Sequence, residues 1–218
     1  EKITVDEEIE RTAPVIEALK REFDPVISLD TYKWQVAEEG IRAGADMIND
    51  IWGLKWDGKM APLLAREGLP ACLMHNRKEA VYVNYMEEVL MDLEETLEIA
   101  HKAQIAKEKI ILDPGVGFGK TYENNLEIID RLEMLHALGY PILLGASRKS
   151  VIGNTLHLPK EERMEGTIVT SVFAVLKGAM FVRVHDVKEN ARAVKMAEAI
   201  RDSGREVQMR QQDGVEQK

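Results

Sequence analysis

The sequence has a single cysteine, no long apolar run and fewer basic than acidic residues. Cys72 is the only cysteine among 218 residues, so the chain cannot form an internal disulfide, and ten methionines suit a reducing compartment. No apolar stretch approaches the roughly eighteen residues that a membrane-spanning helix needs, and the first residues lack the design of a signal peptide. These features predict a cytoplasmic protein in which Cys72 is a buried small hydrophobic residue, not a reactive thiol.

Basic residues are outnumbered by acidic ones, 29 to 38, which gives a formal net charge of −9 at pH 7. A surface this acidic argues against nucleic acid or an anionic membrane as the partner. Hydrophobic residues make up 45% of the chain and charged residues 31%, which suits one globular domain with a substantial core. Glu1 is an unusual natural start, and we therefore expect further residues upstream of it.

Short apolar runs alternate with longer helical patterns, as expected for a parallel sheet buried on both faces. The predicted strands are Pro25–Leu29, Asp46–Asn49, Pro70–Met74, Lys109–Leu112, Pro141–Leu144 and Phe181–Val184. The predicted helices are Asp6–Glu22, Lys33–Ala43, Lys59–Glu67, Asn84–Ala106, Asn124–Leu138, Glu161–Lys177 and Lys188–Asp202. Residues 205–218 have almost no apolar periodicity and are predicted to form a disordered polar tail.

Repeated βα units can form an open, doubly wound sheet or close as a barrel. Open folds of this type usually have a glycine-rich turn after their first strand, and none follows Leu29. Polar residues instead follow strand after strand, and in a barrel the carboxyl ends of all strands converge on one mouth. We therefore predict an α/β fold of the (β/α)8 TIM-barrel type, with residues 1–204 as one barrel domain that lacks the first two βα units. Six strands alone would leave two unpaired parallel edges.

Polar residues follow the first three predicted strands. Asp30 can accept hydrogen bonds from a ligand or cap the next helix. Asn49 can read the edge of an amide or a heterocycle, but a structural role in a turn is an equal alternative. Met74 could form an apolar wall for a flat ligand. His75 could have no role in binding and simply make its hydrogen bonds within the protein.

The run from Asp113 to Lys120, DPGVGFGK, is more specific. Its three glycines let the backbone turn sharply or approach a ligand closely. A phosphate-binding P-loop is excluded, because the first glycine of that motif would fall at Pro114. The Asp113 carboxylate can pair with two adjacent N–H donors of a guanidine-like ring edge.

Cationic residues follow the last two predicted strands. Gly145 leaves room for a planar group, and Lys149 suits a carbonyl oxygen or an anion, with a solvated surface position as the alternative. Arg183 and His185 alternate along the final strand, so they share a face and form a candidate anion clamp. Barrels commonly bind phosphate near their last strands.

A resemblance to bacterial dihydropteroate synthases is carried by six segments, in this order and spacing: ISLDTYK, MINDIWG, LMHNR, LDPGVGFGKT, LLGASRKS and FVRVHDV. The match spans about Thr4 to Ser203. It implies a transferase that joins 6-hydroxymethyl-7,8-dihydropterin diphosphate to p-aminobenzoate and releases pyrophosphate in folate biosynthesis.

The resemblance also implies roles for individual residues. The catalytic residues would be Asp30, Asp113, Lys149 and Arg183. The pterin pocket would be lined by Asp30, Asn49, Asp113 and Lys149, and the flat ring would be wrapped by Ile51, Met74, Phe118 and Gly145. Arg183 and His185 would hold the diphosphate, and Ser150 with the stem of Lys149 would help to place p-aminobenzoate.

The chain departs from the family at its beginning. Relatives open with loops of the NxTPDSFSDGG and ESTRPG types, which are absent from this sequence. In the family these loops complete the p-aminobenzoate site and take part in binding magnesium. The resemblance therefore implies that Mg²⁺ is bound mainly through the diphosphate and such a loop, with no metal ligand in this sequence, and that this chain by itself is inactive. It also implies a homodimer formed through late helices, about Glu161–Lys177.

Two other functions are compatible with the sequence. A related pterin-binding domain transfers the methyl group of a folate to a corrinoid partner, although the SRKS segment and the Arg183 and His185 pair favour the synthase. A non-catalytic pterin-binding or assembly fragment is the other alternative, because of the missing loops.

Overall fold

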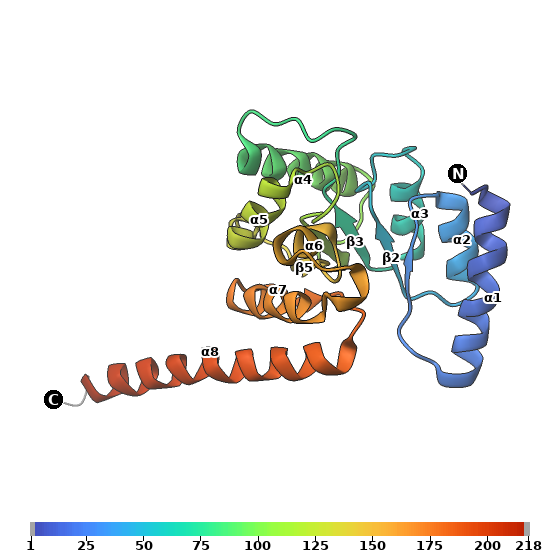
Figure 1. Cartoon of the computed structure of the whole chain (residues 1–218). Coiled ribbons are helices and arrows are strands. Elements are labelled where there is room, and N and C mark those ends of the chain that lie inside the picture. Colours follow the sequence, from blue (N-terminus) through green and yellow to red (C-terminus); the bar gives the residue numbers. More distant parts are fainter. Residues whose placement is uncertain (1–2, 216–218) are drawn as a thin grey trace.

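The computed structural model describes residues 3–215, and the side chains of residues 3–203. After a first helix, short strands and helices alternate along the chain (Figure 1). The strands are β1 (Ser28–Asp30), β2 (Met47–Asp50), β3 (Ala71–Met74), β4 (Ile110–Asp113), β5 (Leu143–Leu144) and β6 (Phe181–Val182). The α-helices are α1 (Val5–Phe23), α2 (Trp34–Arg42), α3 (Met60–Glu67), α4 (Tyr85–Lys102), α5 (Tyr122–Asp130), α6 (Ser150–Leu156), α7 (Met164–Leu176) and α8 (Val187–Val215). The 3₁₀-helices are η1 (Lys107–Lys109), η2 (Leu132–Leu138) and η3 (Lys160–Glu162).

The strands pair in parallel and in sequence order. β1 to β4 form one sheet, β5 and β6 form another, and a bridge between Leu112 and Ile142 links the two sheets. Within the described residues, no strand pairs with the outer edge of β1 or of β6. The six strands therefore leave two open parallel edges, as their number predicts.

The register of the sheet brings polar residues to one face. Asp30 lies opposite Asn49, Asn49 opposite Cys72, and Asp113 opposite Met74. Side chains alternate between the two faces of a strand, so residues two positions apart, such as Cys72 and Met74, share a face. The Asp30, Asn49 and Asp113 side chains therefore leave the sheet on the same side.

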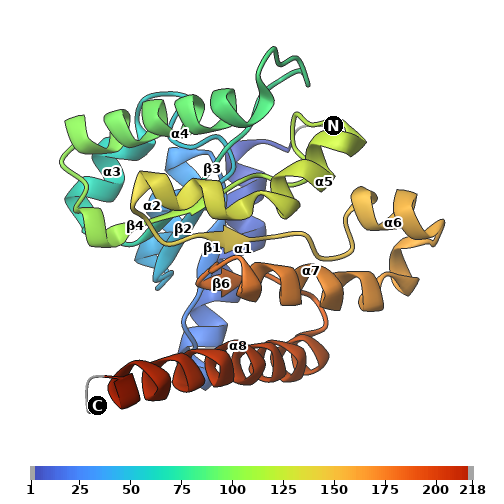
Figure 2. The same cartoon turned by 90° about the vertical axis from the view of Figure 1, so that its left-hand side faces the viewer.

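The opposite face of the strands packs against helices and holds the apolar core. Ile48, Leu73 and Leu112 are fully buried there, and helix α4 contributes Val89 and Leu93 at helical spacing. Figures 1 and 2 show α2 and α3 beside β1 to β3, and α7 running alongside α8, against which it packs. No helix within residues 3–215 is long and apolar enough to cross a membrane.

Three sequence-based predictions of structure are wrong in part. The helix expected at Asn124–Leu138 is divided into α5 and the 3₁₀-helix η2. Helix α6 lies where no helix was predicted, because seven residues are too few to show a helical period. Residues 205–215 continue α8 where we predicted a disordered tail, because their Arg, Glu, Gln and Met residues favour a helix without any apolar stripe. Residues 216–218 of that tail lie outside the described residues.

Candidate active site at the carboxyl ends of the strands

A buried carboxylate lies at the centre of the candidate site. The Asp113 side chain, at the end of β4, is only 5% exposed, and its Oδ1 accepts a hydrogen bond of 2.7 Å from the backbone N–H of Gly115. A β-carbon at Gly145 would lie 3.5 Å from the Asp113 Oδ2, so this oxygen points toward the end of β5. Burial raises the pKa of Asp113, and nearby Lys149 opposes this rise. The carboxylate is therefore placed to gain from a ligand that donates hydrogen bonds.

The glycines after Asp113 allow the loop to lie directly on the segment that follows β3. Gly115 and Gly119 have φ angles of 73° and 52°, which side chains other than glycine rarely adopt. A β-carbon on Gly115 would lie 1.9 Å from the carbonyl oxygen of His75, and one on Gly119 would lie 2.3 Å from that of Arg77. The glycine spacing thus reflects close contact between two loops, and this contact fixes where Phe118 lies.

Lys149 crosses from the residue before α6 to the Asp113 loop. Its Nζ donates a hydrogen bond to the carbonyl of Val116 and lies 4.8 Å from the centre of the Phe118 ring. Burial lowers the pKa of Lys149, while Asp113 raises it. The alternative of a solvated surface lysine is therefore wrong.

Arg183 connects the two open edges of the sheet. Its guanidinium lies 3.0 Å from the Asp30 carboxylate, which joins the end of β6 to the end of β1. The alternative role of Asp30 as a helix cap is wrong, because the cap residue of α2 is Lys33. Next to Arg183, the Nδ1 of His185 lies 2.8 Å from the hydroxyl of Ser147. A cavity of about 230 Å³ opens here and is lined by Gly145, Ser147, Lys149, Arg183, Val184 and His185.

The neighbours Asn49 and Asp50 have different surroundings. Within the described residues, the Asn49 side chain is 6% exposed and has no hydrogen-bond partner. The Asp50 carboxylate instead accepts hydrogen bonds of 2.8 Å from the backbone N–H groups of Trp52 and Leu54, and burial raises the pKa of Asp50 to about 6. Asp50 thus stabilises a turn, whereas the donors and acceptor of the Asn49 side chain are not used in such a turn.

Two residues are buried with their polar groups turned into the protein, as predicted for Cys72 and as one alternative for His75 proposed. Cys72 is fully buried, and burial raises the pKa of its thiol well above the usual value. His75 is 2% exposed, and each of its ring nitrogens lies within hydrogen-bond distance of a partner, Asp92 at 3.0 Å and Lys120 at 2.8 Å.

The structure brings together most of the predicted site residues. Contacts or register place these near one another: Asp30, Asn49, Met74, Asp113, Phe118, Gly145, Lys149, Arg183 and His185. Ile51 follows β2, and the exposed Ser150 begins α6, so both are tied to the cluster only through their neighbours in sequence. Sequence reasoning missed Ser147 and Lys120 as site residues; Lys120 drew attention only through the P-loop comparison.

Comparison with known proteins identifies the family. Residues 1–185 match the family model described as pterin binding enzyme. The dihydropteroate synthase of Clostridium beijerinckii is 56% identical over 91% of this chain and 74% of its own length, and that of Bacillus subtilis is 49% identical over 93% and 71%. A crystal structure of a Clostridium difficile dihydropteroate synthase, in the presence of pteroic acid, has a TM-score of 0.90 at 47% identity and covers 92% of this chain and 76% of its own.

The fold and the polar mouth thus define a pterin-binding enzyme of the β/α-barrel class, and the predicted fold class is confirmed. Within this class, the chain belongs to the dihydropteroate synthase family. The predicted function and enzyme class, a dihydropteroate synthase and hence a transferase, are confirmed by the same comparisons. The relatives described here are synthases, which favours this function over methyl transfer to a corrinoid partner.

Proposed function

We propose that the site binds the pterin ring of 6-hydroxymethyl-7,8-dihydropterin diphosphate, with Asp113 pairing to its amino-pyrimidine edge. The observation that carries this proposal is the buried Asp113 carboxylate facing the glycine at the end of β5, with Lys149 nearby. A pterin edge presents two adjacent N–H donors, and a carboxylate is the acceptor that pairs with both. Asn49, which has no partner within the described residues, supplies donors and an acceptor for the remaining polar atoms of the ring.

The flat ring needs apolar surfaces on its two sides. Met74 ends β3 directly opposite Asp113, Phe118 comes from the loop that follows Asp113, and Gly145 leaves the space beside the Asp113 carboxylate free of a side chain. Ile51 is expected to extend this wall. Lys149, held over the Phe118 ring, is placed to contact the carbonyl oxygen of the pterin.

The diphosphate would lie in the cavity beside Arg183 and His185. In the reaction the bond from the pterin methylene carbon to the diphosphate oxygen breaks, and pyrophosphate leaves with the electron pair. The amine nitrogen of p-aminobenzoate then bonds to the methylene carbon and releases a proton. Arg183 offsets the charge that grows on the leaving group, a form of electrostatic stabilisation that often dominates such barriers. Asp30 orients Arg183 through their ion pair and faces the positive charge that develops on the pterin.

Fewer residues of this chain are assigned to p-aminobenzoate than to the pterin or to the diphosphate. Ser150 is exposed at the start of α6, next to Lys149, and is the residue that we expect to contact this substrate. The chain spans about three quarters of the length of its relatives. We expect p-aminobenzoate to bind more weakly than the pterin.

Among the described residues, no group of three or more His, Cys, Asp or Glu side chains is placed to hold a metal ion. Binding of Mg²⁺ through the diphosphate and an upstream loop stays a prediction, as does the cytoplasmic location. No step of the proposed chemistry is assigned to a metal ion.

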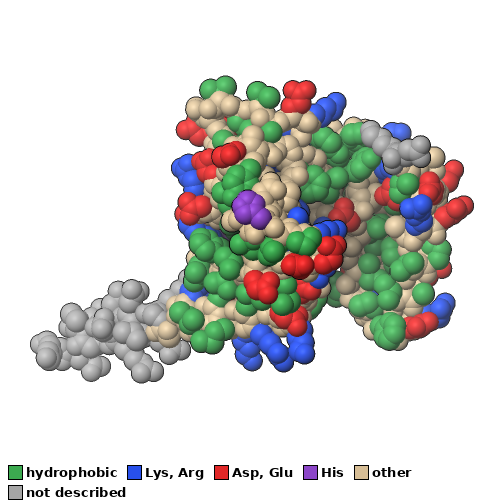
Figure 3. Space-filling model, in the orientation of Figure 1, with side chains coloured by type: hydrophobic (Ala, Val, Ile, Leu, Met, Phe, Trp, Pro, Cys, Tyr) green, Lys and Arg blue, Asp and Glu red, His purple; other side chains and the backbone are tan. Residues whose placement is uncertain are grey.

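We also infer a homodimer, formed through the face that α5, α6 and α7 share. An apolar hollow of about 490 Å³ lies there, and its lining includes Leu126, Leu156, Val169 and Phe173. Each of these four side chains is at least 40% exposed. Figure 3 shows hydrophobic side chains gathered over this part of the molecule. Exposed apolar surface of this extent is typical of an interface between protein chains.

The experiment that tests the pterin site is calorimetry with 6-hydroxymethylpterin and with its diphosphate. We expect both to bind, and Arg183→Met to weaken binding of the diphosphate while leaving the diphosphate-free pterin almost unchanged. An equal loss for both ligands would refute the assignment of Arg183 to the diphosphate.

Turnover is tested with the pterin diphosphate and p-aminobenzoate. We expect the 218-residue chain to bind the pterin without forming dihydropteroate, because the family's opening loops supply part of the second site. Turnover by this chain would refute the need for those loops. Failure to bind any pterin would refute the proposed site itself.

A further inference from the structure

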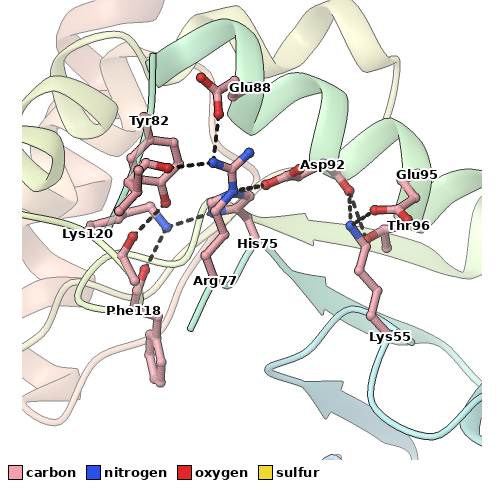
Figure 4. A network of polar contacts seen from close by, with 12 residues as sticks. Lys55, His75, Arg77, Tyr82, Glu88, Asp92, Glu95, Thr96, Phe118 and Lys120 are labelled. Carbon is pink, nitrogen blue, oxygen red and sulfur yellow. Dashed lines mark hydrogen bonds and ion pairs between the residues drawn. The ribbon is translucent and has the colours of Figure 1, made fainter. Parts of the chain in front are cut away.

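A chain of polar contacts runs from α4 to the Asp113 loop. The Nζ of Lys120 lies 2.8 Å from the Nδ1 of His75, and the Nε2 of His75 lies 3.0 Å from the Asp92 carboxylate. Asp92 also accepts a hydrogen bond of 2.6 Å from the Nε of Arg77. Figure 4 shows these side chains pointing toward one another from α4, from the segment after β3 and from the Asp113 loop.

The protonation states in this network follow from its geometry. Burial lowers the pKa of His75 to about 4, so its ring is neutral and has one N–H. Because Lys120 donates to Nδ1, the ring proton lies on Nε2 and is donated to Asp92. Asp92 is therefore anionic, and hydrogen bonds from His75 and Arg77 help to hold its pKa below the usual range. The network thus has one consistent set of donors and acceptors, in which Lys120 contributes the cation.

Lys120 also holds the loop to which it belongs. Its Nζ donates a second hydrogen bond, of 3.0 Å, to the carbonyl oxygen of Phe118. The same loop supplies the Val116 carbonyl that accepts from Lys149, and the Phe118 ring beneath Lys149. A shift of this loop would therefore move both Phe118 and Lys149.

We propose that Lys120 is a positioning residue for the pterin pocket, which ties the Asp113 loop to His75 and thereby fixes Phe118 and Lys149. This inference rests on the proposed pterin site and adds to it a residue that is not among those lining the cavity. Lys120 is not a catalytic residue, because it acts through the groups that it holds.

The charge of Lys120 gives the proposal a specific signature. Burial lowers the pKa of Lys120 to about 7, although Asp113 and, more weakly, Asp92 favour its charged form, while Lys149 and Arg77 oppose it. Below that pH the ammonium group binds the neutral imidazole and the Phe118 carbonyl strongly and favours the ionised form of Asp113. Above it the amine is neutral and both effects weaken.

The test compares Kd values for 6-hydroxymethylpterin at about pH 6 and about pH 8, on either side of the Lys120 pKa. Lys120→Met should raise Kd roughly tenfold at the lower pH, the effect of one charge-assisted hydrogen bond, and only a few-fold at the higher pH. Ionisation of the ligand affects the Kd of the variant and of the wild type equally, so it cancels in the ratio of the two Kd values at one pH. Lys102→Met, at an exposed lysine on α4, is the matched control and should leave Kd unchanged.

Two results would overturn the proposal: an unchanged Kd at both pH values, or a loss by the same factor at both, which would make Lys120 only a structural residue. Lys120→Gln keeps a donor to Phe118 without the charge, so its Kd relative to the wild type should show the same dependence on pH with a smaller loss. It replaces Lys120→Met if thermal unfolding shows that variant to be misfolded. Failure of the wild type to bind the pterin would refute the proposed function instead.

Discussion

Replacing Asp113 by Asn should separate the ligand-binding role of this residue from any role in stability. The substitution keeps the shape of the side chain but removes its charge and places an NH₂ group where one of the two acceptors is needed. A hydrogen bond to a charged group contributes roughly 1.5–3 kcal/mol and a neutral one roughly 0.5–1.5 kcal/mol. Loss of one charged bond and weakening of the other therefore costs about 3 kcal/mol. At about 1.4 kcal/mol per tenfold change, Kd for the pterin should rise by about 10²-fold.

Folding stability should change in the opposite direction or stay constant. The folded-state pKa of Asp113 is raised, chiefly by burial, so the ionised form of this residue costs stability once the pH rises above that pKa. Asn is neutral at every pH and removes this cost. We expect the Tm of Asp113→Asn to equal or exceed that of the wild type, where 1 kcal/mol corresponds to about 2–4 °C for a chain of this size.

The measurements are isothermal titration calorimetry with 6-hydroxymethylpterin and thermal unfolding without ligand. Asp6→Asn, at an exposed aspartate in the first turn of α1, is the control and should leave Kd unchanged. A Tm that falls by several degrees while Kd stays within twofold of the wild type would refute the reasoning, because Asp113 would then be a structural carboxylate.

Three further predictions concern other parts of the molecule. Val169→Glu combined with Phe173→Glu should convert the dimer to a monomer in sedimentation velocity, and an unchanged sedimentation coefficient would exclude this face as the interface. Cys72 should react with a thiol reagent only after unfolding, because it is fully buried with a raised pKa, and rapid labelling of the native protein would contradict this. His75 is neutral in the fold with a pKa lowered to about 4, so the stability that it contributes is present above about pH 6.5 and is lost as the pH falls through 4. Denaturant unfolding should show a loss of a few kcal/mol over that range, smaller in His75→Gln, and equal losses in the two proteins would disprove it.

Sequence patterns were sufficient to predict the order of strands and helices and the end of the sheet at which the site lies. Each predicted strand is a short apolar run, and a polar residue stands at its end or a few positions after it, as with Asp30 and Ser147. Because parallel strands have their carboxyl ends on one side, such residues meet there in any fold of this class. Loop glycines could also be read in advance, since their left-handed φ values at Gly115 and Gly119 are a local property of the chain.

Burial and partners could not be predicted, because they depend on residues far away in the sequence. Asp50 and Asp113 each end a strand, yet both carboxylate oxygens of Asp50 accept hydrogen bonds from its own turn, whereas only Oδ1 of Asp113 does so and its Oδ2 points toward Gly145. Nothing in the run DPGVGFGK indicates that the Lys120 side chain is buried against His75, 45 positions away.

The amino-acid sequence by itself therefore determined the β/α order, the strand ends and the family, since these depend on local apolar patterns and on motifs with fixed spacing. Only the tertiary structure decided that Arg183 pairs with Asp30 across the open edges of the sheet. It likewise decided that Lys149 lies over Phe118. The physical reason is that desolvation and charge pairing act through space, between side chains whose separation the folded backbone sets.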